Sequence, residues 1–294
     1  MRFFIVDAFT ESVFGGNPAG VVLLDQGCDF PDEAVMQKTA AELRYSETAF
    51  IKPAPDGGRL HLRYFTPASE VDFCGHATIA SFTALLKAGF AEKNSSYPIH
   101  TLSGDLTIYT PGSILMEMPA SKLIKRITET AEIEEIYRCL GIEREHVTAN
   151  GRELLPILIS TGFPDIILPV KNRETLAKIE PDFKHLSSLS EKHGAGGAHV
   201  FTIDAPEGVT ACCRNFAPLY DIDEEAATGT ASGGLTYYLH IHGLAPSGYD
   251  CLFLQGEAMG RPSKIITSLD VQGDAPVIKV GGEGAVLAEG EIFI

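Results

Sequence analysis

An internal repeat is the feature that most constrains how this 294-residue chain can fold. Arg63-Tyr64-Phe65-Thr66-Pro67 matches Arg214-Asn215-Phe216-Ala217-Pro218 at an offset of 151 residues. At the same offset, Ala49-Phe50 matches Val200-Phe201. Because repeated supersecondary units produce such self-similarity, the chain is expected to form two similar halves.

A helix with the same start and the same stop extends the repeat. Gly75-His76-Ala77-Thr78 matches Gly229-Thr230-Ala231-Ser232, and Gly89 matches Gly243, both at an offset of 154 residues. The change from 151 to 154 indicates a three-residue insertion around Asp221 to Glu224. Agreement of a helix start and a helix stop in one register favours duplication over chance.

The two matched helices lack a polar face. His76–Ala88 and Thr230–His242 consist almost entirely of small or apolar residues, and a helix that is apolar all round is buried on every side. Two further helices are expected at Pro31–Leu43 and Ala131–Leu140, the second with Gly141 just past its end. Runs rich in β-branched and aromatic residues predict strands at Phe3–Phe9, Gly20–Leu24, Thr48–Lys52, Leu60–Phe65, Leu106–Thr110, Ile114–Met118, Leu155–Ser160, Asp165–Val170, His199–Ile203, Val209–Asn215, Ile265–Ser268, Val277–Val280 and Ala285–Ile294.

These patterns predict an α+β fold of two pseudo-symmetric domains, each a rolled, mostly antiparallel, barrel-like sheet around a central buried helix. The N-terminal domain is expected over residues 1–118, completed by the C-terminal strand 284–294, and the C-terminal domain over residues 119–283. The length also favours two domains. Gly194-Ala195-Gly196-Gly197 lacks the lysine of a phosphate-binding loop, and we expect a flexible loop there.

Charge and cysteine content limit which kinds of partner and which cellular compartment are expected. Asp+Glu number 39 against 23 Lys+Arg, a formal charge of −16, whereas nucleic-acid and anionic-membrane partners require clustered positive charge. The six cysteines form no C-x-x-C pair, and no run of about 18 apolar residues suggests a membrane span. We therefore expect a cytoplasmic protein with no nucleic-acid or membrane partner.

Both buried helices begin with glycine and a polar residue, Gly75-His76 and Gly229-Thr230. The N-terminus of a helix presents unpaired backbone N–H groups and the positive end of the helix dipole, and glycine allows a ligand to approach closely. Two such ends can hold a carboxylate or phosphate without Lys or Arg. The simpler interpretation is that these glycines only permit tight turns.

Glu47 breaks the symmetry of the repeat, since the offset of 151 places it opposite Ala198. Burial at the mouth of an apolar strand is expected to raise the pKa of Glu47 toward the range of a general acid–base catalyst. A solvated glutamate at the end of a strand is the alternative.

Cys74 and His76 flank the first helix start. A thiolate at Cys74 is expected to be favoured by the helix N-terminus, but the repeat places Thr228, not a second cysteine, in the other half. His76 can relay a proton near neutral pH or be structural. The other histidines show no metal-ligand spacing, so we expect no metal.

Several motifs in the same order resemble the PhzF (phenazine biosynthesis-like) family, which is related in fold to diaminopimelate epimerase. They are Asn17-Pro18-Ala19-Gly20, Ser46-Glu47-Thr48-Ala49-Phe50, Arg63-Tyr64-Phe65-Thr66-Pro67, Asp72-Phe73-Cys74-Gly75-His76-Ala77-Thr78, Gly162-Phe163-Pro164, Ala226-Ala227-Thr228-Gly229-Thr230-Ala231 and Gln255-Gly256-x-x-Met259-Gly260-Arg261-Pro262. The resemblance implies two barrel-like domains, a homodimer, no cofactor, and an acid–base isomerase site between the domains that takes a small carboxylate substrate.

The resemblance also implies roles for single residues. Glu47 matches the glutamate that moves the proton, and His76 matches the active-site histidine. Glu225 stands where the phenazine enzyme has Asp, and we expect it to act with the other two in catalysis. Five further residues are expected to bind substrate, namely Asn17, Cys74, Gly75, Gly229 and Thr230. Gly75 and Gly229 are expected to donate backbone hydrogen bonds to the substrate carboxylate. Thr230 stands where the phenazine enzyme has Ser.

Two alternatives stay open beside a cofactor-independent isomerase. One is an epimerase or racemase that uses Cys74 with a partner other than cysteine. The other is a catalytically silent protein that binds a small molecule on an enzyme scaffold.

Overall fold

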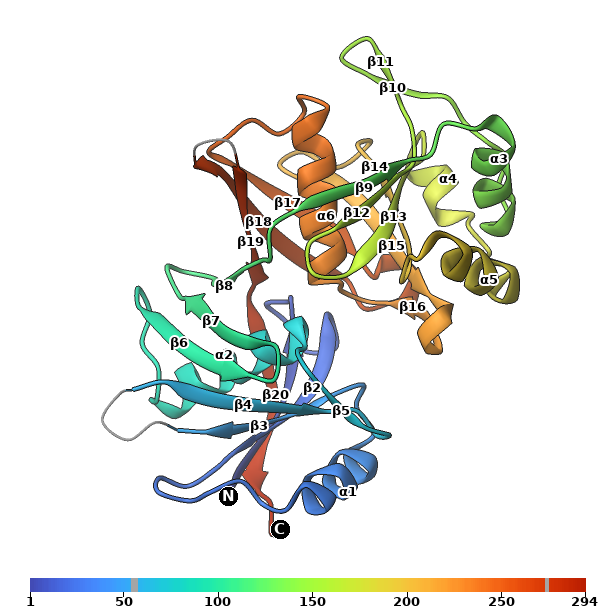
Figure 1. The fold of residues 1–294 in the computed structure, drawn as a ribbon. Helices are drawn as coiled ribbons and strands as arrows, with labels where there is room; N and C mark the ends of the chain where they lie inside the picture. Colours follow the sequence, from blue (N-terminus) through green and yellow to red (C-terminus); the bar gives the residue numbers. More distant parts are fainter. Residues whose placement is uncertain (54–57, 273–274) are drawn as a thin grey trace. The chain divides into compact units, whose positions relative to one another are not determined.

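A computed structural model describes residues 1–53, 58–272 and 275–294 of the chain. The described residues divide into two compact units (Figure 1). Unit 1 comprises Met1–Glu117 and Gly281–Ile294, and unit 2 comprises Met118–Val280. The chain passes between the units twice, so the C-terminal segment returns to the unit in which the N-terminus lies.

The elements of unit 1 are β1 (Arg2–Ala8), β2 (Asn17–Leu23), α1 (Glu33–Leu43), β3 (Thr48–Lys52), β4 (Leu60–Phe65), β5 (Glu70–Val71), α2 (Gly75–Ala88), β6 (Ser96–Thr101), β7 (Gly104–Tyr109), β8 (Ile114–Glu117) and β20 (Gly284–Glu291). Those of unit 2 are β9 (Lys122–Arg126), α3 (Thr130–Cys139), β10 (Val147–Ala149), β11 (Arg152–Leu154), β12 (Ile157–Ser160), β13 (Pro164–Pro169), α4 (Arg173–Ala177), α5 (Phe183–His193), β14 (Gly197–Thr202), β15 (Ala211–Ala217), β16 (Ile222–Glu225), α6 (Gly229–Ile241), β17 (Tyr249–Gln255) and β18 (Ser263–Gln272). Strand β19 (Ala275–Gly282) runs from unit 2 into unit 1.

The two units share one succession of strand pairings. In unit 1, β20, β1 and β2 pair antiparallel, β2 pairs parallel with β3, β3 antiparallel with β4, β4 parallel with β6, and β6 antiparallel with β7. In unit 2, β9, β12 and β13 pair antiparallel, β13 parallel with β14, β14 antiparallel with β15, β15 parallel with β17, and β17 antiparallel with β18. The repeat seen in the sequence is therefore a repeat of topology.

One helix lies inside each rolled sheet. Helix α2 packs against β20, β1, β2, β3 and β8, which come from both ends of the strand succession, and α6 packs against β12, β13 and β18. Every residue from His76 to Phe82 and from Ala231 to Thr236 is buried. The buried hydroxyls of Thr78 and Ser232 each donate to the carbonyl four residues earlier, which offsets their desolvation. The α+β fold class, with two barrel-like sheets around buried helices, is confirmed.

Other helices cover the outer faces of the sheets (Figure 1). In unit 1, Met36 and Ala40 of α1 pack in one buried cluster with strand residues that include Phe50 and Phe65. In unit 2, α3, α4 and α5 share a cluster with β13, β14 and β15. The sequence prediction missed α4 and α5, and also the strands β5, β6, β9, β10, β11, β16 and β17.

The expected loop at Gly194–Gly197 is shorter than predicted, since Gly194, Ala195 and Gly196 lie outside helix and strand but Gly197 does not. Gly194 ends α5 in the left-handed conformation (φ 66°), and Gly197 begins β14. Ala195 is buried, and a Cβ on Gly196 would lie 1.8 Å from a ring atom of Phe163. From Ala195 onward the connection from helix to strand is buried, and only glycine fits at position 196 beside the Phe163 ring.

The repeated arginine makes the same ion pair in each unit. Arg63 donates twice to Glu70, at 2.6 Å each, and Arg214 donates twice to Glu224, at 2.9 and 2.8 Å. The arginines are 151 residues apart and the glutamates 154, which agrees with the change of offset. The insertion forms a turn with Asp221 in the left-handed conformation (φ 60°).

Strand register corrects one detail of the repeat. Phe50 pairs with Arg63 across β3 and β4, whereas Val200 pairs with Arg214 across β14 and β15. Phe50 therefore corresponds to Val200, an offset of 150, and Glu47 corresponds to Gly197 instead of Ala198. Similar apolar residues on neighbouring positions of the strand concealed this shift of one residue.

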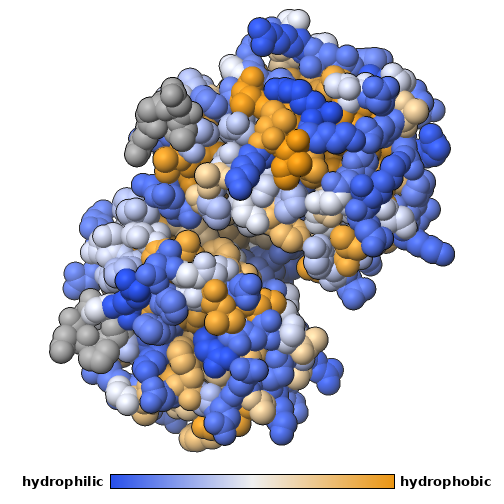
Figure 2. All heavy atoms as spheres, viewed as in Figure 1, coloured by the Kyte–Doolittle hydropathy of each residue, from blue (hydrophilic) through white to orange (hydrophobic). Residues whose placement is uncertain are grey.

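Hydrophilic side chains cover much of the visible face of each unit, in keeping with the charge of −16 (Figure 2). Within the described ranges, no helix is long and apolar enough to span a membrane.

Candidate active site

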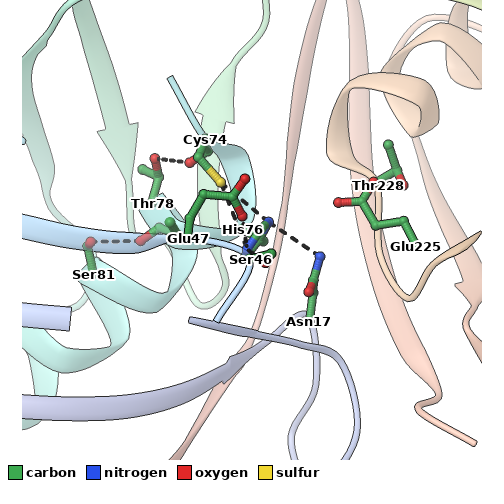
Figure 3. A network of polar contacts seen from close by, with 10 residues as sticks. Asn17, Ser46, Glu47, Cys74, His76, Thr78, Ser81, Glu225 and Thr228 are labelled. Atoms are coloured by element: carbon green, nitrogen blue, oxygen red, sulfur yellow. Dashed lines mark hydrogen bonds and ion pairs between the residues drawn. The ribbon is translucent and has the colours of Figure 1, made fainter. Parts of the chain in front are cut away.

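His76 is the centre of a polar cluster in unit 1, at the start of α2 (Figure 3). Its Nε2 lies 3.1 Å from Oε2 of Glu47 and 3.2 Å from Oγ of Ser46. Its Nδ1 lies 3.3 Å from Nδ2 of Asn17 and 3.4 Å from Sγ of Cys74. We call these five residues the His76 cluster. Asn17 begins β2, Ser46 and Glu47 directly precede β3, and Cys74 is the N-cap residue of α2.

The His76 cluster is largely buried. The exposed fractions of the His76 and Glu47 side chains are 5% and 18%. Oε2 of Glu47 is buried, and among the described residues it has the charge contact with His76 but no aligned hydrogen bond. A carboxylate oxygen in this condition is free to accept a proton from a bound molecule.

Charge coupling, rather than burial, sets the protonation of Glu47 and His76. Burial alone would raise the pKa of Glu47, but the positive charge of His76 and polar contacts with His76, Ser46 and Cys74 outweigh it and lower that pKa. Burial would lower the pKa of His76, but interactions with Cys74 and Glu47 raise it well above its ordinary 6.5. Burial therefore acts in the expected direction, but the expected net rise in the pKa of Glu47 is wrong.

The expectation of a favoured thiolate at Cys74 is also wrong. Burial and the negative charge of Glu47 raise the pKa of this thiol, and they outweigh the imidazolium and the backbone N–H of Ala77. Because Cys74 stays protonated, Glu47 is the negative partner of His76. At neutral pH the cluster holds a carboxylate, an imidazolium and a neutral thiol.

Asn17 can serve either charge state of His76. Its amide nitrogen donates to a neutral Nδ1, and after rotation of the amide its oxygen accepts from a protonated one. A side chain with both a donor and an acceptor therefore lies beside a histidine whose proton can move.

Glu47, Cys74 and His76 are also the described residues that could hold a metal ion, with one ligand atom each, all within 4.8 Å of one another. Carboxylate, thiolate and imidazole groups bind zinc. In this structure, however, the three groups are partnered with one another through the ion pair and hydrogen bonds already described.

The start of α2 is open beside this cluster. Its N-cap residue, Cys74, makes no side-chain capping hydrogen bond. A Cβ placed on Gly75 would meet only Sδ of Met116, at 3.9 Å, among the described residues. The Gly75 backbone can therefore be approached closely by a ligand, as the sequence predicted for this helix start.

A second polar cluster lies at the corresponding helix start of unit 2. Glu225 ends β16, and Thr228, the N-cap residue of α6, donates its hydroxyl to Oε2 of Glu225 at 2.6 Å (Figure 3). Nε2 of Gln255 donates to the Glu225 carbonyl at 2.7 Å and to the Thr228 hydroxyl at 3.1 Å, and its Oε1 accepts from the Thr228 N–H at 3.3 Å. We call Glu225, Thr228 and Gln255 the Glu225 cluster.

The remaining predicted residues of unit 2 lie at the same helix start. Gly229 and Thr230 are the first two residues of α6, and the Thr230 carbonyl accepts from the hydroxyl of Thr161 at 2.7 Å. Of the predicted site residues, Asn17, Glu47, Cys74, Gly75 and His76 come together in unit 1, and Glu225, Gly229 and Thr230 come together in unit 2.

The sequence analysis missed Ser46, Thr228 and Gln255 as members of these clusters. Each lies inside a motif on which the family resemblance rests. Ser46 and Thr228 directly precede the predicted site residues Glu47 and Gly229. Gln255 is 1% exposed and holds both ends of the loop before α6. The sequence feature that could have identified Gln255 is its position as a polar residue at the end of a predominantly apolar strand.

The fold places the chain among proteins built from two barrel-like sheets, each around a buried helix. A probable proline racemase of Agrobacterium radiobacter shares this fold at 12% identity and a TM-score of 0.65, and covers 100% of this chain and 93% of its own. That likeness shows the fold alone.

The family model described as phenazine biosynthesis-like protein matches residues 6–290, and the chain belongs to this family. A PhzF-family protein of Bacillus anthracis has a TM-score of 0.86 at 28% identity. The match covers 100% of this chain and 99% of that protein. An uncharacterized isomerase of Deinococcus radiodurans is 34% identical, with 98% of this chain and 94% of the relative covered. An uncharacterized isomerase of Clostridium acetobutylicum is 32% identical, and the match covers 98% of this chain and 97% of the relative. The chain is therefore a PhzF-family isomerase.

Proposed function

We propose that this isomerase moves a proton on a small carboxylate substrate by general acid–base catalysis without a cofactor. The observation that carries the proposal is the buried Glu47–His76 ion pair, in which Oε2 of Glu47 has no aligned hydrogen bond. Because its pKa is lowered, Glu47 is ionised at neutral pH and can accept a proton from a substrate carbon.

In this mechanism Glu47 removes the proton and returns it to another position on the substrate. The imidazolium of His76 donates to the negative charge that develops on the substrate, and Asn17 steadies the ring in either charge state. Glu225, whose carboxylate accepts from Thr228, orients polar groups of the substrate. The substrate carboxylate accepts from the backbone N–H groups at Gly75 and Gly229, with Thr230 and Cys74 lining the site.

We further propose that the helix starts of both predicted domains, residues 1–118 with 284–294 and residues 119–283, contribute to binding the substrate. The matched starts of α2 and α6 support this, because each offers backbone donors beside a carboxylate. We also propose a cytoplasmic homodimer, which sedimentation equilibrium tests. All six cysteines are free, as expected in a reducing compartment.

The decisive experiment is a screen of small carboxylic acids for incorporation of solvent deuterium. The wild-type protein should exchange a carbon-bound hydrogen of at least one acid, and Glu47→Gln should lose this exchange. Glu42→Gln, an exposed change on α1 of the same unit, is the matched control and should exchange normally. Exchange that survives in Glu47→Gln would show that Glu47 is not the proton carrier.

The same substrates separate the two alternatives. An epimerase that uses Cys74 should be inactivated by Cys74→Ala, whereas the proposed mechanism keeps most of its turnover. A silent binding protein should bind an acid tightly and exchange no hydrogen at any of its carbons.

A further inference from the structure

Strand register places Pro18 of β2 and Pro164 of β13 at the same point of the repeat. Val22 and Leu168 pair with the corresponding residues of β3 and β14, and each proline lies four residues before them. The strands that pair with these prolines are β1 in unit 1 and β12 in unit 2. The connection from β1 to β2 can therefore be compared directly with the connection from β12 to β13.

The connection is much longer in unit 1 than in unit 2. Asp7 of β1 lies opposite Pro18, and ten residues separate the two; Ser160 of β12 lies opposite Pro164, and three residues separate them. Only the longer connection leads into a member of the His76 cluster, Asn17. The repeat is therefore expanded beside the cluster in which Glu47 has no counterpart.

Asp7 holds the middle of the longer connection. Asp7 is 1% exposed, and its Oδ2 accepts the backbone N–H of Phe14 at 2.8 Å. Phe14 has the left-handed conformation (φ 71°), which a residue with a Cβ rarely adopts. Because Phe14 is 67% exposed, packing of its ring does not enforce this conformation. The hydrogen bond to the buried carboxyl group therefore stabilises a strained turn.

The connection ends at the residue that contacts Nδ1 of His76. Asn17 is the first residue of β2 and 7% exposed, and its Nδ2 lies 3.3 Å from that ring nitrogen. Gly16, just before it, has φ 60°, and a Cβ there would lie 2.0 Å from the backbone oxygen of Ala8. Two residues separate Phe14 from Asn17. A shift of the turn at Phe14 therefore displaces the backbone that carries the Asn17 amide.

We propose that Asp7 is a positioning residue for the isomerase reaction, because its hydrogen bond to Phe14 holds the Asn17 amide against Nδ1 of His76. Asp7 acts through the connection and not on the substrate. This assignment deepens the proposed function and rests on it, since Asn17 there steadies the His76 ring while the proton moves.

A double-mutant cycle between Asp7 and Asn17 tests the proposal with the acid found by the exchange screen. Asp7→Ala and Asn17→Ala should each lower kcat about ten- to hundredfold, with a smaller change in KM. The double variant should be about as slow as the slower single variant, because both changes remove the same contact with His76. Asp25→Ala, an exposed change in unit 1, is the matched control and should keep the wild-type kcat. Losses that multiply in the double variant overturn the proposal, as does an unchanged kcat in Asp7→Ala.

Two further variants separate positioning from a general loss of stability. Asp7→Asn keeps an oxygen that can accept the Phe14 N–H, so it should lose less kcat than Asp7→Ala, and it replaces Asp7→Ala in the cycle if that variant does not fold. Phe14→Gly adopts positive φ without strain, so it should restore part of the kcat lost in Asp7→Ala. If Phe14→Gly restores the urea midpoint of Asp7→Ala but none of its kcat, the positioning role is wrong.

Nitrogen NMR of labelled histidine side chains tests the same contact without any substrate. Asp7→Ala and Asn17→Ala should shift the Nδ1 resonance of His76 in the same direction, and Asp25→Ala should leave it unchanged. A resonance that moves in Asn17→Ala but not in Asp7→Ala overturns the positioning role even if Glu47 proves to be the catalyst. A failed exchange screen beside matching shifts overturns the proposed function alone.

Discussion

At the scale of the residue, the chemistry of the site depends on a pair of opposite charges. The pKa of Glu47 is lowered and that of His76 is raised, so each stabilises the charged form of the other. Residue type and motif suffice to single out both residues from the sequence. Their charge states were not predictable from it, because they depend on distances of a few ångströms across β3 and α2.

The first prediction concerns the pH dependence of this pair. The folded pKa of Glu47 lies below its ordinary 4.5, so its contribution to stability is present above pH 4.5 and is lost as pH falls through the folded value. The folded pKa of His76 lies above 6.5, so its contribution is complete below pH 6.5 and is lost as pH rises through the folded value. His76→Asn should therefore lower the free energy of unfolding most between pH 4.5 and 6.5, by about 1–3 kcal/mol.

Urea denaturation from pH 4 to 9 measures this effect. His185→Asn removes a longer and more exposed contact with Glu135, at 3.5 Å, and is the control; it should cost less stability than His76→Asn. A penalty for His76→Asn that grows steadily above pH 7 contradicts the ion pair.

The second prediction tests whether unit 2 has room for a counterpart of Glu47. Gly197→Ala would place its Cβ 2.0 Å from the backbone oxygen of Phe216. Backbone has to shift, so the free energy of unfolding should fall by about 1–3 kcal/mol or more. Gly290→Ala, in a strand position with nothing within 4 Å of the added Cβ, is the matched control and should change little. Equal stability of the two variants would refute the assigned register.

At the scale of the element, the repeated arginine anchors each half, but not equally. Arg214 donates to Glu224 and also to the carbonyls of Leu176 and Ile179 at the end of α4 and just beyond it, at 3.2 and 2.8 Å. Arg63 donates to Glu70 and to the exposed Glu33. The exposed fractions of the two arginine side chains are 11% and 23%.

The third prediction follows from this asymmetry. Arg214→Lys removes the planar fork that reaches Glu224 and both carbonyls, and should lower the free energy of unfolding by about 1–2 kcal/mol. The partners of Arg63 are carboxylates, and a lysine at this more exposed position can still pair with them. Arg63→Lys should therefore lower the free energy of unfolding by less. Denaturant midpoints at one pH compare the two variants directly, and a larger loss in Arg63→Lys would contradict the role given to the α4 carbonyls.

Elements were predictable where a periodic pattern coincided with the repeat. Helices α2 and α6 were found because both lack a polar face, and their ends because Gly89 and Gly243 adopt positive φ of 77° and 69°. Helix α5 was missed although Asp182 caps its start and Gly194 ends it. Its face toward the core is narrow, carried by Leu186 and Leu189. Its neighbours placed Asp165 inside a strand, and nothing in the local pattern marked its carboxyl group as buried.

At the scale of the whole molecule, a net charge of −16 should oppose the binding of the proposed carboxylate substrate, while the two helix starts should attract it locally. The repulsion acts over long range and is screened by salt, since the Debye length falls from about 30 Å at 0.01 M to about 8 Å at 0.15 M. Contacts with backbone N–H groups are short and are screened much less. Salt should therefore weaken the repulsion more than the attraction.

The fourth prediction is that KM for the carboxylic acid found by the exchange screen falls as salt is raised from 0.01 to 0.15 M, by about two- to tenfold. The uncharged amide of the same acid is the control, and its binding should not depend on salt. Initial rates at fixed pH measure both. A KM for the acid that rises with salt would mean that a positively charged group dominates the site. The backbone donors at Gly75 and Gly229 would then not be the principal anchor of the substrate carboxylate.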